Sequence, residues 1–307
     1  MPKYQVSKSI KVGKSPEEVY KIISDFNHWT AWSPWIITEP ETKVTVDVEK
    51  KTYHWEGERT GEGEMVISNE KENESLDIDL TFLKPWKSKS KVGFQVKPDG
   101  DGTHVTWTMD GSLPFFMFWM KNMMQAFIGM DYERGLNLLK DYVEDGEIHS
   151  KIEFTGTTQF EGCKYIGIRS KRKFEDIGPD MEKQFGKLME WSKENENNVA
   201  GAPFSIYHKW DAVKRTTEYT ACVPVNEIPA SLPAGMTSGS VPATAMNTIG
   251  HVGPYMHIGN AWSTQYSMKQ SKKIKVNKNI DPIEVYMNSP MEVGPNELHT
   301  VIHMPIK

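Results

Sequence analysis

The chain of 307 residues contains only two cysteines, Cys163 and Cys222, and neither sits in a Cys-x-x-Cys motif. Two isolated thiols give no disulfide framework and no cysteine-rich zinc site, and they suit a reducing compartment. His299 and His303 do not form a zinc site either, since they are four residues apart in an expected strand and therefore about 13 Å from each other. The N-terminus also lacks the charged and apolar regions of a secretory signal. We therefore expect a cytoplasmic protein, and we predict no metal and no other cofactor.

Charge of one sign and long apolar runs are also scarce. The net charge is -5 at pH 7, and no stripe of Lys and Arg marks a nucleic-acid or membrane surface. The most apolar run, 113–120, ends at Lys121, well short of the roughly 20 residues that cross a bilayer. We therefore expect no nucleic acid and no membrane as partner. The 38% of apolar residues, with 10 Trp and 17 Met, predict a globular protein of about two domains.

The first part of the chain predicts an antiparallel sheet followed by a long helix. Residues 4–12 alternate as a strand does, and Ser15-Pro16-Glu17-Glu18 then supplies an N-cap, a proline at the first helical position and a Glu at the third. Apolar periodicity predicts a long helix over 113–143. Between them, six alternating segments separated by turn residues indicate a meander: 43–48, 52–58, 63–70, 75–83, 88–97 and 103–109.

Aromatic residues and methionines in this part admit two interpretations. Trp29, Trp32 and Trp35 recur every third residue, and they either close one end of a core or line a ligand entrance. The apolar residues of 115–120 and 123–124 either fill a core or line a cavity, because Met adapts to irregular apolar shapes. The residues alone leave both alternatives open. No catalytic set of His, carboxylate and nucleophile is evident here.

This part of the chain resembles the SRPBCC superfamily, which includes START-like and polyketide cyclase-like proteins. The order of strand, short helices, meander and long helix matches, and four motifs carry the resemblance: Ser15-Pro16-Glu17-Glu18-Val19-Tyr20, Asp25-Phe26-Asn27-His28-Trp29, Trp32-Ser33-Pro34-Trp35 and Gly102-Thr103-His104-Val105-Thr106-Trp107. The resemblance implies a helix-grip fold, in which a curved sheet wraps the last helix, often with a hydrophobic cavity between them. We expect this domain over residues 1–147.

The remaining part repeats itself at an offset of roughly 75 to 81 residues, longer than a solenoid unit. Each copy predicts a β-α-β-β unit, and three pairs of segments carry the match: 177–181 with 252–256, 203–207 with 282–286, and 223–225 with 304–306. Because a polar stretch ends near Ser150, we expect a second domain over 150–307. Its halves should pair about a pseudo-two-fold axis and leave a cleft where they meet.

One position of the repeat changes charge, since the second copy has Glu284 where the first has Ser205. Side chains alternate along a strand, so Glu284 and Tyr286 share one face. If the helices cover the opposite face of Ile and Val, Glu284 looks into the cleft among aromatic residues and would attract a flat, lipophilic cation. A solvent-exposed edge strand is the alternative. The candidate ligand-binding residues are Glu284, Tyr286, Tyr207, Trp210, Tyr255 and Trp262.

The same region is similar to the GyrI-like domain, the small-molecule-binding domain of AraC- and MerR-type effector sensing. The residues that carry this resemblance are Gly250-His251-Val252-Gly253-Pro254-Tyr255, the helix with Trp262, and Asp281-Pro282-Ile283-Glu284-Val285-Tyr286-Met287-Asn288-Ser289-Pro290. The resemblance implies that Glu284 and Tyr286 lie in a multidrug-type pocket of a bacterial protein, with aromatic walls. An SRPBCC-like module stands where such regulators have a helix-turn-helix, so direct DNA binding is not expected.

We therefore expect an α+β protein that binds a lipophilic or cationic small molecule in its second domain, has a second hydrophobic cavity in its first domain, and senses or sequesters toxic compounds. Two alternatives stay open. In the first, the protein is a hydrolase of reactive electrophiles, and Glu284 is the catalytic residue that positions water. In the second, it is a regulator that binds another protein, as a gyrase inhibitor does. The residues themselves do not separate an enzyme from a binding protein.

Overall fold

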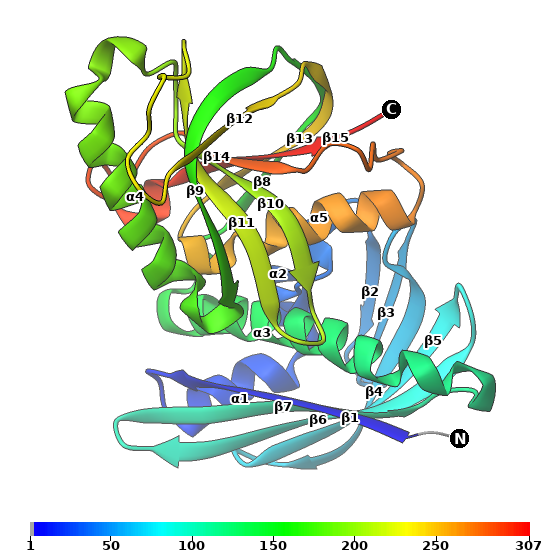
Figure 1. The fold of residues 1–307 in the computed structure, drawn as a ribbon. Coiled ribbons are helices and arrows are strands. Elements are labelled where there is room, and N and C mark those ends of the chain that lie inside the picture. Colours follow the sequence, from blue (N-terminus) through cyan, green and yellow to red (C-terminus); the bar gives the residue numbers. More distant parts are fainter. Residues whose placement is uncertain (1–2) are drawn as a thin grey trace. The chain divides into compact units, whose positions relative to one another are not determined.

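The computed structural model describes residues 3–307 and divides into two compact units, one ending at Ser150 and one spanning Lys151–Lys307. Each unit is an antiparallel sheet with helices packed against it (Figure 1). The predicted α+β class, with a helix-grip sheet followed by a duplicated second sheet, is therefore confirmed.

The first unit contains a seven-stranded sheet in the order β1-β7-β6-β5-β4-β3-β2. Every pairing is antiparallel, and each strand lies within a few residues of an alternating segment of the sequence. The strands are β1 (Lys3–Val12), β2 (Lys43–Asp47), β3 (Thr52–Gly57), β4 (Gly61–Lys71), β5 (Ser75–Lys84), β6 (Ser88–Asp99) and β7 (Gly102–Ser112).

The helices of this unit begin where local signals place them. Ser15 and Glu18 form the predicted capping box at the start of the first helix, each side chain accepting the backbone N–H of the other. The predicted long helix is present, but its first six residues are 3-10 and not α. The helices are α1 (Pro16–Ser24), η1 (Phe26–His28), α2 (Trp29–Trp32), η2 (Ile36–Thr38), η3 (Phe115–Met120) and α3 (Lys121–Asp145).

Aromatic rings fill the space between α3 and the sheet around the middle of the helix. Trp107 of β7 stacks on Tyr132 of α3, with ring centroids 3.9 Å apart. Gly135 permits this approach, because a Cβ there would lie 2.7 Å from the Trp107 ring. Trp29 and Trp32 are buried in the same core. The core-closing interpretation therefore holds for these two tryptophans.

The second unit contains an eight-stranded sheet in the order β12-β9-β11-β10-β14-β15-β13-β8. Its strands are β8 (Lys151–Phe160), β9 (Cys163–Lys173), β10 (Phe204–Asp211), β11 (Thr216–Val225), β12 (Thr237–Val241), β13 (Thr244–Val252), β14 (Ile283–Tyr286) and β15 (His299–Pro305). Its helices are η4 (Phe174–Asp176), α4 (Ile177–Glu194), η5 (Glu196–Asn198), η6 (Tyr255–His257), α5 (Gly259–Gln270) and η7 (Pro295–Glu297).

The strand order of this sheet is symmetric once the two copies are matched. β10 and β14 meet at the centre, β11 and β15 flank them, and β9 and β13 follow. The outermost strands are exchanged, because β8 pairs with β13 of the second copy and β12 pairs with β9 of the first. The duplicated unit is therefore β-β-α-β-β, one leading strand longer than the sequence predicts.

The pairing of β10 with β14 sets Ser205 directly opposite Glu284. Equivalent elements of the two copies are offset by about 80 residues. The match of Gly178-Pro179 with Gly253-Pro254 has a shorter offset and is not a structural equivalence, since the first pair lies in the first turn of α4 and the second precedes η6. The pseudo-two-fold axis therefore relates the matched strands of the two copies, and it does not relate the two Gly-Pro pairs.

Candidate functional site

The helices of the second unit lie on the face of the sheet that carries Glu284. Trp262 of α5 donates its Nε1–H to Glu284 Oε2 at 2.6 Å, and Met181 of α4 lies 3.6 Å from the Tyr286 hydroxyl. Ile283 lies on the opposite face of β14, in an apolar cluster that does not include Met181 or Trp262. The expectation that the helices cover the Ile/Val face is therefore wrong, although Glu284 and Tyr286 do share a face. Glu284 consequently lies between the central strands and the helices.

Glu284 is a buried carboxylate that accepts three hydrogen bonds from neutral groups. The residue is 3% exposed, and β14 is a central strand, so the edge-strand alternative is excluded. Besides the Trp262 indole, the hydroxyls of Tyr286 and Tyr207 donate to Oε1 at 2.8 Å and 3.3 Å. The Tyr286 hydroxyl also lies 3.0 Å from Ser205 Oγ. Tyr286 thus connects the two positions at which the copies differ in charge.

In the described part of the chain, no cation balances the charge of Glu284. Burial raises the pKa of Glu284 above its ordinary value of 4.5, and the hydrogen bonds from Trp262, Tyr286 and Tyr207 oppose this rise only in part. Among residues 3–307, none of the groups that shift this pKa is a cation. Burial and the nearby carboxylate raise the pKa of Tyr207 and of Tyr286 far above the ordinary value, so both hydroxyls keep their protons.

Aromatic rings connect the other predicted residues to this carboxylate. Tyr207 meets Trp262 edge to face, with centroids 5.1 Å apart. Tyr255 of η6 meets Tyr286 in the same way at 6.0 Å, and its side chain is exposed. The structure therefore brings Glu284 and these four rings into one cluster, with Tyr255 on its solvent side.

Trp210 is the outermost of the six predicted residues. Its ring reaches the cluster through Tyr207, at 6.4 Å, and stacks on Phe174 at 4.2 Å. A β-bulge between Tyr207 and Lys209 shifts the register of β10, so Trp210 pairs with Thr217. Because Thr217 alternates onto the same face as Tyr219, the bulge turns Trp210 toward the helix side of the sheet. Regular alternation would have pointed it the other way.

Four residues of the cluster were not among the sequence candidates. Met181 and Phe185 of α4 contact Tyr286, and Tyr266 of α5 stacks on Trp262 at 6.3 Å. The fourth is Ser205, noted only as the counterpart of Glu284. The signal for the first three was the apolar stripe of each helix, which is also what an ordinary core produces.

The first half of this unit has a buried carboxylate of its own. Asp180 of α4 accepts hydrogen bonds from the Tyr219 hydroxyl at 2.7 Å and from Gln184 at 3.0 Å, and it pairs with Arg172 at 2.9 Å. Burial favours a higher pKa of Asp180, but the hydrogen bonds, including the one from Arg172, lower it below the ordinary 3.8. This carboxylate is therefore ionised and neutralised within the chain.

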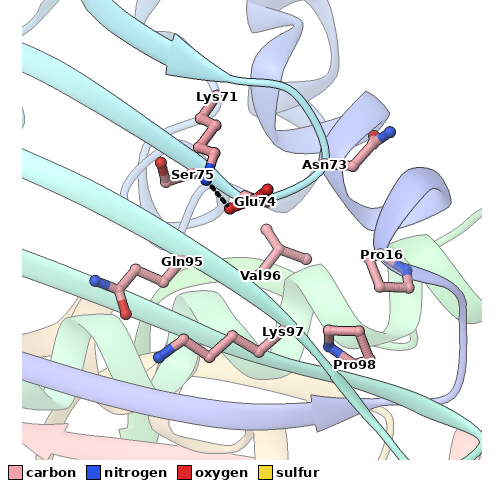
Figure 2. A pocket seen from close by; sticks show the side chains of 9 residues that line it. All are labelled: Pro16, Lys71, Asn73, Glu74, Ser75, Gln95, Val96, Lys97 and Pro98. Carbon is pink, nitrogen blue, oxygen red and sulfur yellow. Dashed lines mark ion pairs between the residues drawn. The ribbon is translucent and has the colours of Figure 1, made fainter.

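The first unit has a surface hollow of about 570 Å³ beside the turn between β4 and β5. Figure 2 shows that its walls come from this turn, from β6 and from the start of α1. Lys71 and Glu74, both at this turn, form an ion pair at 2.5 Å. The lining is Pro16, Lys71, Asn73, Glu74, Ser75, Gln95, Val96, Lys97 and Pro98. This surface hollow is distinct from the apolar interior in which a ligand cavity was expected.

Within residues 3–307, no group of three or more His, Cys, Asp or Glu side chains is placed to hold a metal ion. None of the helices in the same range is both long and apolar enough to cross a membrane.

Comparison with protein families divides the chain at the same place as the fold. Residues 3–144 match the family described as polyketide cyclase / dehydrase and lipid transport. Residues 158–307 match the GyrI-like small molecule binding domain. No curated protein matches the sequence. Both resemblances stated from the sequence are therefore confirmed at the level of the family.

Several solved structures are distantly similar. The EcmrR–DNA complex in EcmrR-RPo is 14% identical, with a TM-score of 0.42 over 60% of this chain and 68% of that one. The EcmrR C-terminal domain is 18% identical, with a TM-score of 0.39 over 52% of this chain and 98% of that one. Protein MLL2253 from Mesorhizobium loti is 13% identical, with a TM-score of 0.37 over 47% and 99%. All three likenesses are remote.

Proposed function

Since the chain joins an SRPBCC domain of the polyketide cyclase and lipid transport family to a GyrI-like small-molecule-binding domain, we propose that it binds lipophilic aromatic cations at Glu284 and so sequesters or senses toxic compounds. One observation carries the proposal. Glu284 is a buried carboxylate that accepts its hydrogen bonds from neutral groups, namely one indole and two phenols. A cationic ligand would supply the positive charge that these partners of Glu284 lack.

The surroundings of Glu284 suit a flat cation for two reasons. A carboxylate shielded from water attracts a charge far more strongly than an exposed one, because the local dielectric constant is low. The faces of Tyr207, Tyr286 and Trp262 add cation–π attraction, which contributes about 0.5–2 kcal/mol for each ring. Exposed Tyr255 marks the side from which a ligand enters. Selectivity in such a site comes from charge and flatness more than from directional hydrogen bonds.

Two ligands that differ only in charge test the proposal. We expect N-methylacridinium to bind the wild type at least about tenfold more tightly than neutral acridine, which corresponds to roughly 1.4 kcal/mol. The variant Glu284→Gln should lose this preference and keep its affinity for acridine. Glu227→Gln removes one exposed carboxylate from the same domain and should change neither affinity. Equal binding of the cation by wild type and Glu284→Gln would reject an electrostatic role for Glu284.

We also propose that the first domain holds an apolar ligand between α3 and its sheet. Because rings of Trp107 and Tyr132 fill the middle of that interior, the ligand would lie nearer η3, where Met120 and Met124 pack against the core. Displacement of a fluorescent fatty acid measures this binding. Met124→Trp, which narrows that end, should weaken it, and unchanged affinity would reject the location.

A hydrolase remains the second candidate, and the state of Glu284 favours it specifically. A buried carboxyl group with a raised pKa beside two phenols has the character of a general acid or base. Turnover of an aromatic epoxide by the wild type but not by Glu284→Gln would support this activity. Stoichiometric binding of the same compound without product would support a binding protein instead.

A further inference from the structure

The start of the long helix of the first unit presents its largest apolar side chains to solvent. Met117, Met120, Met124 and Ile128 pack against the core. The outward side carries an aromatic patch whose members are Phe115, Phe116, Phe118, Trp119, Met123 and Phe127. The four aromatic residues of η3 are between 61% and 77% exposed. A helix selected only to cover a core would have the reverse arrangement, with aromatic rings inside.

Trp86 adds a seventh exposed apolar residue at the same end of the sheet. It lies in the hairpin between β5 and β6 and is 64% exposed. Because Ser90 of β6 pairs with Gly111 of β7, the hairpin and η3 extend from the same end of neighbouring strands. Single exposed apolar residues are ordinary, but a contiguous group of this kind marks an interaction surface.

The two chain segments that carry the aromatic patch contain only positive charges. Segments 83–90 and 111–130 contain four lysines and no Asp or Glu, in a chain whose net charge is -5. The nearest acidic residues in the sequence, Asp110, Asp131 and Glu133, lie just outside the second segment. Lys84 pairs with Glu62, whereas Lys87 and Lys89 are exposed beside Trp86. Lys121 follows η3 directly. The patch is therefore an apolar centre with a cationic rim.

We propose that this aromatic patch docks on the surface of an anionic lipid bilayer. Trp and Phe insert at the boundary between headgroups and acyl chains, and lysines around them attract anionic headgroups. A second copy of the chain is a poorer occupant, because a two-fold contact through the patch would bring lysines against lysines. This surface is peripheral and does not span the bilayer, so it departs from the sequence expectation of no membrane partner.

Cosedimentation of the full chain with vesicles tests the proposal. The vesicles are phosphatidylcholine alone and phosphatidylcholine with about 30% phosphatidylserine, an anionic surface. We expect binding to the anionic vesicles that weakens at high salt. The double variant Phe118→Ala/Trp119→Ala should bind at least about tenfold more weakly. Lys87→Gln/Lys89→Gln should lose about fivefold for each lysine on anionic vesicles only.

The matched control removes exposed apolar groups from elsewhere in the chain. Val48→Ala/Met291→Ala changes residues that are 67% and 97% exposed, and it should bind as the wild type does. Thermal unfolding of every variant separates lost binding from lost folding. Absence of wild-type binding to anionic vesicles overturns the proposal. So does a concentration-dependent dimer that only Phe118→Ala/Trp119→Ala abolishes, since the patch would then join two copies.

Discussion

The two halves of the second domain each bury a carboxylate beside tyrosine, but only the first half provides a cation for it. Asp180 has Arg172 at 2.9 Å and a lowered pKa. Glu284 has an indole and two phenols, and a raised pKa. Both groups accept three or more hydrogen bonds, so satisfied hydrogen bonding does not distinguish them. The two carboxylates differ in whether a countercharge lies beside them.

Under the proposed function, this difference separates a carboxylate that stabilises the fold from one that binds a cationic ligand. Breaking a buried pair leaves an uncompensated charge and costs stability. A buried carboxylate without a cation is already uncompensated, so its removal should not lower the free energy of unfolding. The two residues should therefore respond in opposite directions to the same isosteric change, from carboxylate to amide.

The largest effect is expected from making the halves alike in charge. Ser205→Asp places a second carboxylate directly across from Glu284, where side chains of paired strands lie about 5 Å apart. At pH 7 we expect it to be about 3 kcal/mol less stable than Ser205→Asn, which has the same volume and no charge. Urea unfolding measures both. Equal stability of the two variants would mean that water reaches this position.

Removing the neutralised carboxylate should have the next largest effect. Asp180→Asn deprives Arg172 of its partner and sets an amide donor against the donors of Tyr219 and Gln184. We expect a loss of about 2 kcal/mol in the free energy of unfolding. Asp176→Asn, an exposed change beside the same helix, should stay within about 0.5 kcal/mol of the wild type. A comparable loss of stability in Asp176→Asn would show that the effect is not specific to the buried ion pair of Asp180.

The same change at Glu284 should not cost stability. At pH 7 we expect Glu284→Gln to equal the wild type or to exceed it by about 1 kcal/mol, since a neutral amide still accepts from Trp262 and pairs with the phenols. The measurement is again the urea midpoint. A loss as large as that of Asp180→Asn would show that the three donors outweigh the burial of charge.

The smallest effect is the dependence of these differences on pH. Because the folded pKa of Glu284 is raised, the folded state holds its proton more tightly, and stability falls as pH rises from 4.5 through that pKa. The advantage of Glu284→Gln should therefore vanish near pH 4.5 and grow above it. For Asp180 the folded pKa is lowered, so its contribution is present above 3.8 and disappears as pH falls below that value. Unfolding measured across this range should give slopes of opposite sign.

Local patterns were sufficient to predict most of the fold. Alternation and turn residues located every strand of the first sheet, and the capping residues Ser15 and Glu18 located the start of α1. These signals depend on neighbours in the chain, which a sequence displays directly. The duplicated strands around Ser205 and Glu284 were visible for the same reason.

What the sequence did not show depends on contacts between distant segments. Alternation predicts which residues share a face with Glu284. Because both faces of β14 are buried, it does not predict which face packs against the helices. The bulge that redirects Trp210 has no composition signal of its own. Within residues 3–307, the neutral groups around Glu284 come from β10, β14 and α5, which are far apart in the chain, so residue spacing does not reveal them.

The joining of the two copies in one chain has a consequence for the number of charges beside their pseudo-two-fold axis. A dimer of identical subunits joined by a two-fold axis must carry two copies of every residue beside that axis, and hence either two carboxylates or none. Two linked copies are free of this restriction and can differ by one residue. With Ser205 on one side and Glu284 on the other, the chain holds a single carboxylate at this pair of positions, as the proposed binding of one monovalent cation requires.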